Sequence, residues 1–322
     1  MAITELLTLG EAFDDLIFLN LPRIPRPGEE VKTNGFVATI GGGAIISAVA
    51  ARRLGVRCRV VSAMSNSAAD YLRSQGVSVR NLRRRGEPHA ISAALSTATN
   101  RSFVTYNGVN DVLEDRLLPM LAIERARHVH FAFYPRSCRR WEAVVHHLRD
   151  ARVTTSWDFG WNEALLGDRG FPALLRALDY VLFNAQEAML YSRRRTLVAA
   201  LAAWRRSPMH VVVKLGAHGS RWVGRGTDLQ APAARARVVD TTGAGDAFNG
   251  GFLAGRLRDL DPRLSLRLGN HVGTASTRRA GGLDGLPSRD ELPAAFTKLT
   301  TQAVTNKPTT RRSRSTGSVP TS

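Results

Sequence analysis

Short apolar runs alternate with stretches of helical periodicity along most of this chain. Each run is rich in Val, Leu, Ile or Phe and has the length of a strand buried on both faces. The runs that predict strands are Leu6–Gly10, Arg57–Ser62, Val129–Phe133, Val153–Trp157, Tyr180–Phe183 and Val211–Lys214. Stretches that predict helices between them include Ala44–Leu54, Trp141–Arg149 and Ala188–Trp204. This alternation predicts an α/β fold with a mostly parallel sheet covered on both faces, in which ligands bind beyond the carboxyl ends of the strands.

Two segments, within residues 18–40 and 90–106, depart from this alternation. They carry Val, Ile, Thr and Phe in short extended pieces, and Pro22, Pro25 and Pro27 interrupt the first of them. Proline is confined to strand edges and ends, so these pieces predict a few short strands outside the main sheet. A small β-sheet of this kind would project over the ligand site as a lid.

The last part of the chain, from about Thr301 to Ser322, consists of Thr, Ser, Arg and Pro with almost no apolar residue. Such a segment cannot bury enough apolar surface to offset the entropy that ordering costs. We therefore predict one domain over residues 1–302 and a disordered basic tail over residues 303–322.

Composition narrows the class of protein only slightly. The 322 residues suffice for one large α/β domain, no run of eighteen apolar residues predicts a membrane span, and the first residues lack the basic start of a secretory signal. Two cysteines, Cys58 and Cys138, form no disulfide framework or metal cluster, so we expect free thiols in a reducing cytoplasm. The net charge of +18 comes from scattered arginines without a nucleic-acid-binding motif, so we expect no specific nucleic-acid partner.

The segment Asp240–Phe252 carries the strongest chemical signal. It reads Asp-Thr-Thr-Gly-Ala-Gly-Asp-Ala-Phe-Asn-Gly-Gly-Phe, follows a short apolar run at Arg237–Val239 that predicts a strand end, and continues with helical spacing. Glycines on both sides of Ala244 let backbone N–H groups converge at a helix N-terminus, which makes an anion-binding site. Asp246 would repel a resting phosphate there, so we interpret it as a general base that takes a proton from an attacking hydroxyl group. The simpler alternative is that Asp246 only caps the helix.

This segment resembles the second signature of the ribokinase-like (PfkB) sugar kinases, D-T-x-G-A-G-D-x-F, and the resemblance covers nearly all of residues 6–290. It implies a three-layer α/β/α fold with a β-sheet lid, and transfer of the γ-phosphoryl group of ATP to a hydroxyl of a sugar or nucleoside-like substrate. In this interpretation Asp246 is the base, and the N–H groups of Gly243, Ala244 and Gly245 form the anion hole. ATP and Mg²⁺ are the implied cofactors.

The stretch Gly10–Asp15 resembles the opening strand of the same family, whose aspartate binds sugar hydroxyl groups. The family spacing favours Asp15 over Asp14 for this role. A carboxylate can accept hydrogen bonds from two hydroxyl groups at once, which suits a diol. The alternative is a solvated acid in a turn.

Gly41, Gly42 and Gly43, with the helix that follows them, resemble the first signature of the family, whose glycines let the backbone approach the sugar. The chain departs from the family where Gly43 replaces the usual polar residue and Ile46 replaces the usual asparagine. The loop at Ser65–Asp70 is also shorter than usual. We expect Ile46 to face the acceptor, and the pocket to be less polar than a ribose pocket.

The remaining resemblances concern the nucleotide. Asn184-Ala185-Gln186-Glu187 matches the family motif N-x-x-E, which implies that Glu187 supports Mg²⁺ through water, and an ordinary capping pattern is the alternative. The residues that the resemblance places near ATP are Asn184, Lys214, Gly216, Gly219, Thr241 and Asn270. A β-hairpin turn is the alternative for the glycines. Asp158 is expected to order the phosphate side, and Ala280-Gly281-Gly282 resembles a turn near a monovalent-cation site that only some family members use.

A kinase is not the only function that this fold supports. A non-catalytic sugar- or nucleotide-binding regulatory protein is the alternative, and the departures at Gly43, Ile46 and Ser65–Asp70 favour it, whereas the intact motif around Asp246 favours a kinase. The resemblance also implies a homodimer that forms through the lid strands. We expect a small-molecule substrate and no membrane partner.

Overall fold

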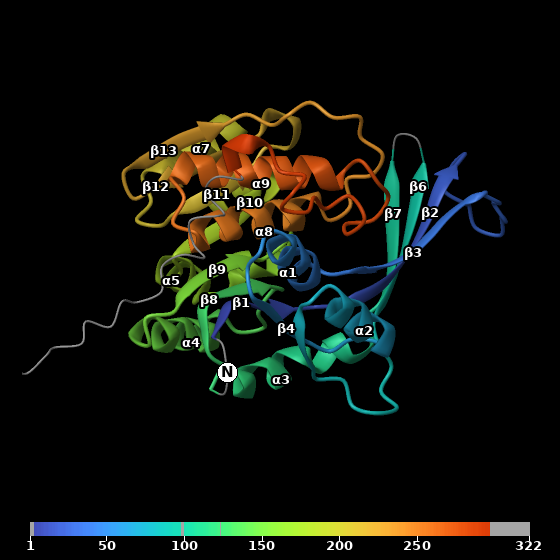
Figure 1. The fold of residues 1–322 in the computed structure, drawn as a ribbon, viewed down its shortest axis with the longest axis horizontal. Coiled ribbons are helices and arrows are strands. Elements are labelled where there is room, and N and C mark those ends of the chain that lie inside the picture. Colours follow the sequence, from blue (N-terminus) through green and yellow to red (C-terminus); the bar gives the residue numbers. More distant parts are fainter. Residues whose placement is uncertain (1–2, 98–99, 123, 297–322) are drawn as a thin grey trace, which may run out of the picture.

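In the computed structural model, which describes residues 3–97, 100–122 and 124–296, the chain forms one large sheet with helices on both faces and a small separate sheet (Figure 1). The strands are β1 (Thr4–Gly10), β2 (Phe13–Leu21), β3 (Gly35–Gly41), β4 (Cys58–Ser62), β5 (Ser78–Asn81), β6 (Ile91–Thr97), β7 (Arg101–Tyr106), β8 (Ala126–Ala132), β9 (Thr154–Asp158), β10 (Tyr180–Asn184), β11 (Val211–Lys214), β12 (Ser220–Gly224) and β13 (Thr227–Ala231). The α-helices are α1 (Gly43–Arg53), α2 (Asn66–Ser74), α3 (Leu113–Met120), α4 (Cys138–Asp150), α5 (Phe171–Ala177), α6 (Ala185–Ser192), α7 (Leu197–Arg205), α8 (Ala244–Leu257) and α9 (Pro262–Ser276). Short 3₁₀ turns are η1 (Gly108–Val112), η2 (Glu163–Gly167) and η3 (Gly216–His218).

The large sheet confirms the mostly parallel architecture that the sequence predicts. Its nine described strands run in the order β13-β12-β11-β10-β9-β8-β1-β4-β5. Every neighbouring pair from β11 to β5 is parallel, and only the β11–β12 and β12–β13 pairs are antiparallel. The carboxyl ends of the parallel strands therefore share one edge of the sheet, where the candidate site residues follow.

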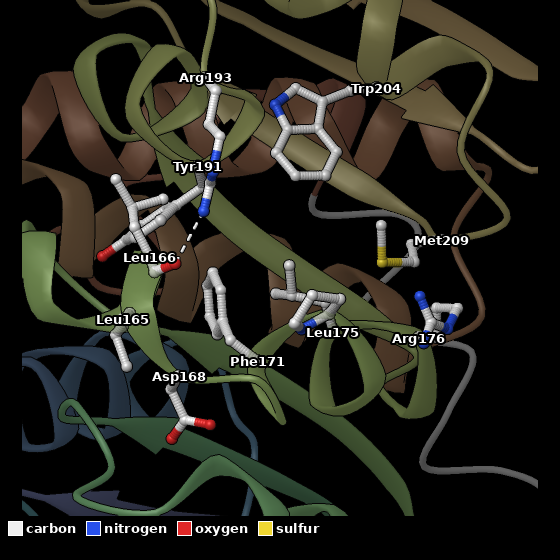
Figure 2. Close-up of a pocket in the computed structure, with 11 residues that line it drawn as sticks. Leu165, Leu166, Asp168, Phe171, Leu175, Arg176, Tyr191, Arg193, Trp204 and Met209 are labelled. Atoms are coloured by element: carbon white, nitrogen blue, oxygen red, sulfur yellow. Dashed lines mark hydrogen bonds between the residues drawn. The ribbon is translucent and has the colours of Figure 1, made fainter.

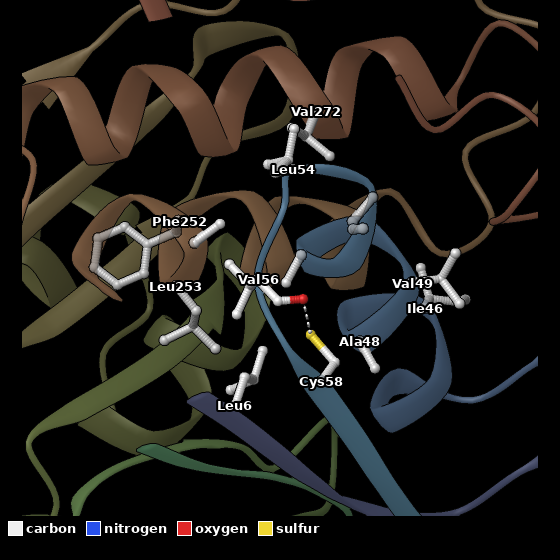
Figure 3. Close-up of a cluster of buried hydrophobic side chains, with 14 of the residues drawn as sticks. Leu6, Ile46, Ala48, Val49, Leu54, Val56, Cys58, Phe252, Leu253 and Val272 are labelled. Carbon is white, nitrogen blue, oxygen red and sulfur yellow. Dashed lines mark hydrogen bonds between the residues drawn. The ribbon is translucent and has the colours of Figure 1, made fainter. Parts of the chain in front are cut away.

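Helices cover both faces because successive side chains of the strands point to opposite sides. On β1, Leu6 joins one buried apolar cluster, whereas Leu7 and Leu9 join the other. The first cluster packs β1 and β4 under α1, α2, α8 and α9, and Figure 3 shows its Phe252 and Val272 from the last two helices. The second cluster lies under α3 to α7. The result is the three-layer α/β/α arrangement that the resemblance implies.

The small sheet has the order β3-β2-β6-β7 among the described residues and projects away from the main body (Figure 1). Its β2–β3 and β6–β7 pairs are antiparallel, and β2–β6 is parallel. The predicted lid strands are thus confirmed as a sheet of their own. It begins earlier than expected, at Phe13, so Asp14 and Asp15 lie on the lid strand β2 rather than on the opening strand of the large sheet.

One predicted helix is wrong. The stretch Ala188–Trp204 is divided between α6 and α7, because Arg193 adopts a left-handed conformation with φ of 54° and Thr196 starts a new helix by accepting the N–H of Ala199. The predicted tail at residues 303–322 lies outside the described residues. No helix within the described ranges has the length and apolar content needed to cross a bilayer.

Candidate active site

The glycine-rich loop leads directly into α8, as the sequence predicts. Gly243 is the N-cap residue with φ of 69°, the left-handed region that favours glycine, and Asp246 lies in the first turn. The expected strand end at Arg237–Val239 is wrong. Val238 and Val239 are exposed, and the backbone there is fixed by a hydrogen bond from the Val239 N–H to the Thr277 carbonyl.

The expected anion hole is partly occupied by the loop itself. The N–H of Ala244 donates to the Thr241 carbonyl at 3.2 Å. The N–H groups of Gly243 and Gly245 make no hydrogen bond within the described part of the chain. Two of the three predicted donors thus stay available to a ligand at the positive end of a helix dipole.

Asp246 does not act as a helix cap, which was the simpler alternative. The N-cap position belongs to Gly243, and α8 has no side-chain cap hydrogen bond. Within residues 3–296 as described, no hydrogen bond is made by the Asp246 carboxyl group, although its backbone carbonyl accepts from Ser47 Oγ at 3.0 Å. Burial and the charge of Asp158 raise the pKa of Asp246 to about 7, against the opposing charge of Lys214. A carboxyl group in this state can exchange protons near neutral pH.

Lys214 lies beside the anion hole in a buried polar cluster. Its Nζ is 2.5 Å from Asp158 Oδ2, and Asn249 Nδ2 donates to the same oxygen at 2.7 Å. A Cβ added at Gly245 would lie 3.3 Å from Lys214 Nζ, so the ammonium group borders the loop. Burial alone would lower the pKa of Lys214, but Asp158, Glu187 and Asp246 raise it, and the lysine stays charged. Asn249, one turn after Asp246, was not predicted as a site residue.

Glu187 and Asn184 form a complete capping box at the start of α6. The Glu187 N–H donates to Asn184 Oδ1 at 2.9 Å, and the Asn184 N–H and side-chain amide donate to the two Glu187 oxygens at 2.8 and 2.6 Å. Burial and then the charge of Asp158 raise the pKa of Glu187 to about 7, and the charge of Asp246 contributes. The capping alternative is therefore realised.

These contacts also decide how a magnesium ion fits the site. No group of three or more His, Cys, Asp or Glu side chains within the described residues is arranged to hold a metal ion. The charge of Asp158 nevertheless raises the pKa of both Glu187 and Asp246, and the charge of Asp246 raises that of Glu187, a repulsion that a nearby cation would relieve. Because both Glu187 oxygens already accept hydrogen bonds, the residues suit an ion held through water better than one bound directly.

The predicted substrate aspartate lies against the glycine stretch. A Cβ at Gly41 would overlap Asp15 Oδ2, and a Cβ at Gly43 would lie 2.9 Å from Asp246 Oδ1. Residues 41–43 thus run between the two carboxyl groups. The Asp14 carboxyl group is engaged by Ser65 Oγ at 2.8 Å and His89 Nε2 at 3.1 Å, whereas the Asp15 carboxyl group makes no hydrogen bond with any described residue. Burial, then the charges of Asp14 and Asp240, raise the pKa of Asp15 to about 7.

We expected Ile46 to face the acceptor, but its side chain is buried. Only 2% of the residue is exposed. A Cβ added at Gly243 or at Gly282 would lie 2.6 Å from Ile46 Cδ1. The side chain packs against the loop at Gly243 and the turn at Gly282. The direction of a side chain on a buried helix depends on what packs around it, which the motif alone does not reveal.

The predicted nucleotide residues beyond Lys214 have structural roles in this arrangement. Gly216 and Gly219 lie in the loop of the β11–β12 hairpin, which was the simpler alternative, and a Cβ at Gly219 would overlap the Ala231 carbonyl. The Asn270 amide donates to the carbonyls of Ala231 and Pro232 at 2.9 and 3.2 Å. Thr241 is exposed and contributes its carbonyl to the loop turn.

A separate cavity lies among η2, α5, α6 and α7 (Figure 2). Figure 2 shows Phe171, Tyr191 and Trp204 along this cavity. It also shows the hydrogen bond that the Arg193 guanidinium group donates to the Leu166 carbonyl. None of the predicted site residues lines it. The candidate active site is therefore the region between the lid and α8, defined by Asp15, residues 41–43, Lys214 and residues 240–246.

Comparisons with known proteins identify the family and the fold. A model of the pfkB family carbohydrate kinases matches residues 3–289. The uncharacterized sugar kinase YegV of Escherichia coli (strain K12) is 26% identical over 308 residues, which cover 89% of this chain and 92% of that protein. Ribokinase from Cryptococcus neoformans var. grubii serotype A in complex with ADP has a TM-score of 0.76 at 22% identity, covering 94% of this chain and 100% of that one. Burkholderia thailandensis nucleoside kinase in complex with inosine has a TM-score of 0.74 at 22% identity, covering 91% and 98%. At these identities the likeness to solved structures establishes the fold alone.

Proposed function

The chain belongs to the pfkB family of carbohydrate kinases and is a phosphotransferase with an alcohol acceptor, and from this premise we propose that it transfers the γ-phosphoryl group of ATP to a sugar or nucleoside-like substrate with Asp246 as the general base. The observation that carries the proposal is the state of Asp246. Its carboxyl group is free of hydrogen bonds to the described residues and lies in the first turn of α8, next to the free N–H groups of Gly243 and Gly245.

The substrate is held so that its hydroxyl group meets this carboxylate. Asp15 accepts hydrogen bonds from substrate hydroxyl groups across the glycine stretch, and the close approach of Gly43 to Asp246 directs the reacting hydroxyl to the base. Asp246 takes the proton as the hydroxyl oxygen forms its bond to the γ-phosphorus. The bond from that phosphorus to the β–γ bridging oxygen breaks, and ADP leaves. The proton then passes from Asp246 to water.

The negative charge of the transferring group is met by fixed donors. The N–H groups of Gly243 and Gly245 point to the phosphoryl oxygens, and Lys214 adds a positive charge beside Gly245. Mg²⁺, when bound, neutralises phosphate charge, and Glu187 would hold it through water. Asn184 fixes the Glu187 carboxylate.

The alternative is a regulatory protein that binds the same ligands without catalysis. The Asp246 carboxyl group, which makes no hydrogen bond to the described residues, disfavours it, because an acid that repels phosphate weakens binding but serves proton transfer. An ATP-dependent screen of sugars and nucleosides, read as ADP release, distinguishes the two. A kinase releases ADP only with its acceptor and loses this activity in Asp246→Asn. A binding protein shows ligand-dependent thermal stabilisation in both forms and releases no ADP.

We also propose that two copies associate through the lid. Phe36 on β3 and Val104 and Tyr106 on β7 share one face of the lid sheet by strand register, and each is at least 55% exposed. Exposed apolar side chains gathered on one small sheet are typical of an interaction surface. The mass of the protein in solution tests this, since a monomer at all concentrations contradicts it.

A further inference from the structure

One arginine of the lid reaches across to the loop that precedes the anion hole. Arg101 begins β7, and its guanidinium group donates to Thr242 Oγ1 at 2.5 Å and to Asp240 Oδ1. Its Nε donates to Ser96 Oγ on the paired strand β6 at 3.2 Å. The side chain is 23% exposed and that of Asp240 is fully buried. No sequence motif identified this pair, because 139 residues separate its members.

Asp240 joins three parts of the molecule. Its Oδ1 accepts the Thr242 N–H at 2.9 Å and the Thr242 hydroxyl at 2.8 Å, and its Oδ2 accepts the Gly281 N–H at 2.9 Å. Burial alone would raise the pKa of Asp240, but these hydrogen bonds and the charge of Arg101 hold it below its usual value. A buried carboxylate needs a positive partner, and Arg101 supplies it. Asp240 therefore fixes the loop three residues before Gly243.

The same carboxylate borders the turn at residues 280–282, which resembles a turn near a monovalent-cation site. Gly281 donates to Asp240, and a Cβ at Gly281 would lie 3.0 Å from Thr39 Cγ2 of the lid strand β3. A dissociable cation here would share the Asp240 carboxylate with Arg101. The guanidinium group already provides one positive charge with directed donors, so these residues do not fit a site for such an ion.

We propose that Arg101 is a positioning residue, which holds the 240–243 loop through Asp240 in place of a dissociable monovalent cation and makes phosphoryl transfer independent of K⁺ and Na⁺. The inference rests on the proposed kinase function and deepens it. Arg101 touches neither substrate nor phosphate in this account. It acts through Asp240 on the backbone that presents the Gly243 and Gly245 N–H groups. Its positive charge also offsets the negative charge of Asp240, which raises the pKa of Asp15.

The first experiment measures turnover of the full chain, with the best acceptor from the screen, in KCl, NaCl and choline chloride at equal ionic strength. The wild type should show the same kcat in all three salts. Arg101→Met should lower kcat by about tenfold or more with little change in the KM for ATP, because a misplaced loop weakens transition-state contacts. Arg101→Lys should recover part of the loss. Arg23→Met is the matched control, because Arg23 pairs with Glu29 within the segment that joins β2 to β3. The kcat of this variant should match that of the wild type.

Two further measurements separate the effect of the Arg101 charge from the effect of its side-chain packing. Millimolar guanidinium chloride or KCl should raise the kcat of Arg101→Met, because either cation would supply the missing positive charge beside Asp240. Melting temperature gives a readout that needs no acceptor. That of Arg101→Met should rise more in KCl than in choline chloride, whereas that of the wild type should not.

The inference is overturned if wild-type turnover or melting temperature depends strongly on K⁺. It is equally overturned if Arg101→Met equals the wild type in both readouts, or if neither cation restores it. Absence of turnover by the wild type on every acceptor would count against the proposed function, and the melting temperatures would still decide the role of Arg101.

Discussion

Asp246 lies among other acids rather than among hydrogen-bond donors, and this sets its chemistry. Burial and Asp158 raise its pKa to about 7, Asp15 adds to the effect, and Lys214 opposes it. A base with a pKa near the working pH combines a useful ionised fraction with a sufficient driving force for proton transfer. The same surroundings make the ionised form costly in the folded protein without ligands.

The free-energy cost of ionising Asp246 in the folded protein predicts that stability depends on pH. The folded pKa, about 7, lies above the ordinary value of 3.8, so between these values the folded state keeps a proton that the unfolded state has released. Stability contributed by this group is therefore present below about pH 4 and is lost as the pH rises to about 7. Asp246→Asn removes the ionised form, so its unfolding free energy relative to wild type should increase from about pH 5 to about pH 8 in denaturant titrations without ATP.

Asp70→Asn is the control for this comparison, because that carboxylate is 74% exposed on α2. Its difference from wild type should be the same at both pH values. Parallel behaviour of Asp246→Asn and Asp70→Asn would show that Asp246 titrates normally.

Gly41→Ala should disturb the substrate aspartate. The new Cβ would overlap Asp15 Oδ2 and displace the carboxylate. We expect the KM for the acceptor to rise by about tenfold, the scale of one lost hydrogen bond, with the KM for ATP unchanged. Gly167→Ala, where no atom lies within 4 Å of the added Cβ, should leave both values unchanged. An unchanged acceptor KM in Gly41→Ala would remove Asp15 from the substrate site.

Sequence reasoning predicted the site residues that share a local motif and missed those joined only by packing. The spacing of glycines around Asp246 identified the loop because its chemistry depends on the backbone of consecutive residues. Arg101 carries no such signal, because only the lid sheet brings it to Asp240. The direction of Ile46 was wrong because residues far along the chain, Gly243 and Gly282, decide it.

At the scale of elements, α6 places two candidate site residues, Asn184 and Glu187, at its start. The capping box joins Asn184 to Glu187 with three hydrogen bonds and places the carboxylate at the carboxyl edge of the sheet. The helix then ends at Arg193, and α7 restarts at Thr196. The start of α6 was identified from its sequence pattern. The break was not, because apolar residues continue on both sides of it.

Asn184→Ala should separate the structural role of the cap from its role toward the nucleotide. Loss of the side-chain cap should lower the unfolding free energy by about 1 kcal/mol. Because the Glu187 carboxylate also loses a donor, the KM for Mg²⁺–ATP should rise. Thr196→Ala, which removes the cap of α7, should cost a similar free energy and leave that KM unchanged. Equal KM values in the two variants would restrict Asn184 to capping.

At the scale of the whole molecule, the strand runs predicted the large sheet well because buried parallel strands are short and continuously apolar. The segment before the active-site loop was harder to predict. Val238 and Val239 read as a strand, yet they follow β13 in the sequence, belong to neither sheet of the described residues and are exposed. The lid and body meet at Arg101 and Asp240, so the position of the lid and the order of the loop at residues 240–243 are linked.

Deleting residues 303–322 should change neither melting temperature nor activity. The tail offers no apolar side chain cluster that could anchor it to the body. A longer deletion, of residues 291–322, is the control, because it removes the buried side chains of Leu292 and Phe296 and should lower the melting temperature. A clear drop after the shorter deletion would show that the tail docks on the domain.

The most direct measurement of the central claim is single-turnover phosphoryl transfer by Asp246→Asn with the best acceptor, alongside its affinity for ATP. The account predicts an unchanged ATP affinity and a rate roughly 10²- to 10⁴-fold below wild type, the range for loss of a general base. The wild-type rate should also fall as the pH drops below about 7, the pKa of Asp246, and the residual rate of the variant should lack this step. An Asp246→Asn variant that transfers phosphate at the wild-type rate would contradict the assignment of the base and, with it, the proposed mechanism.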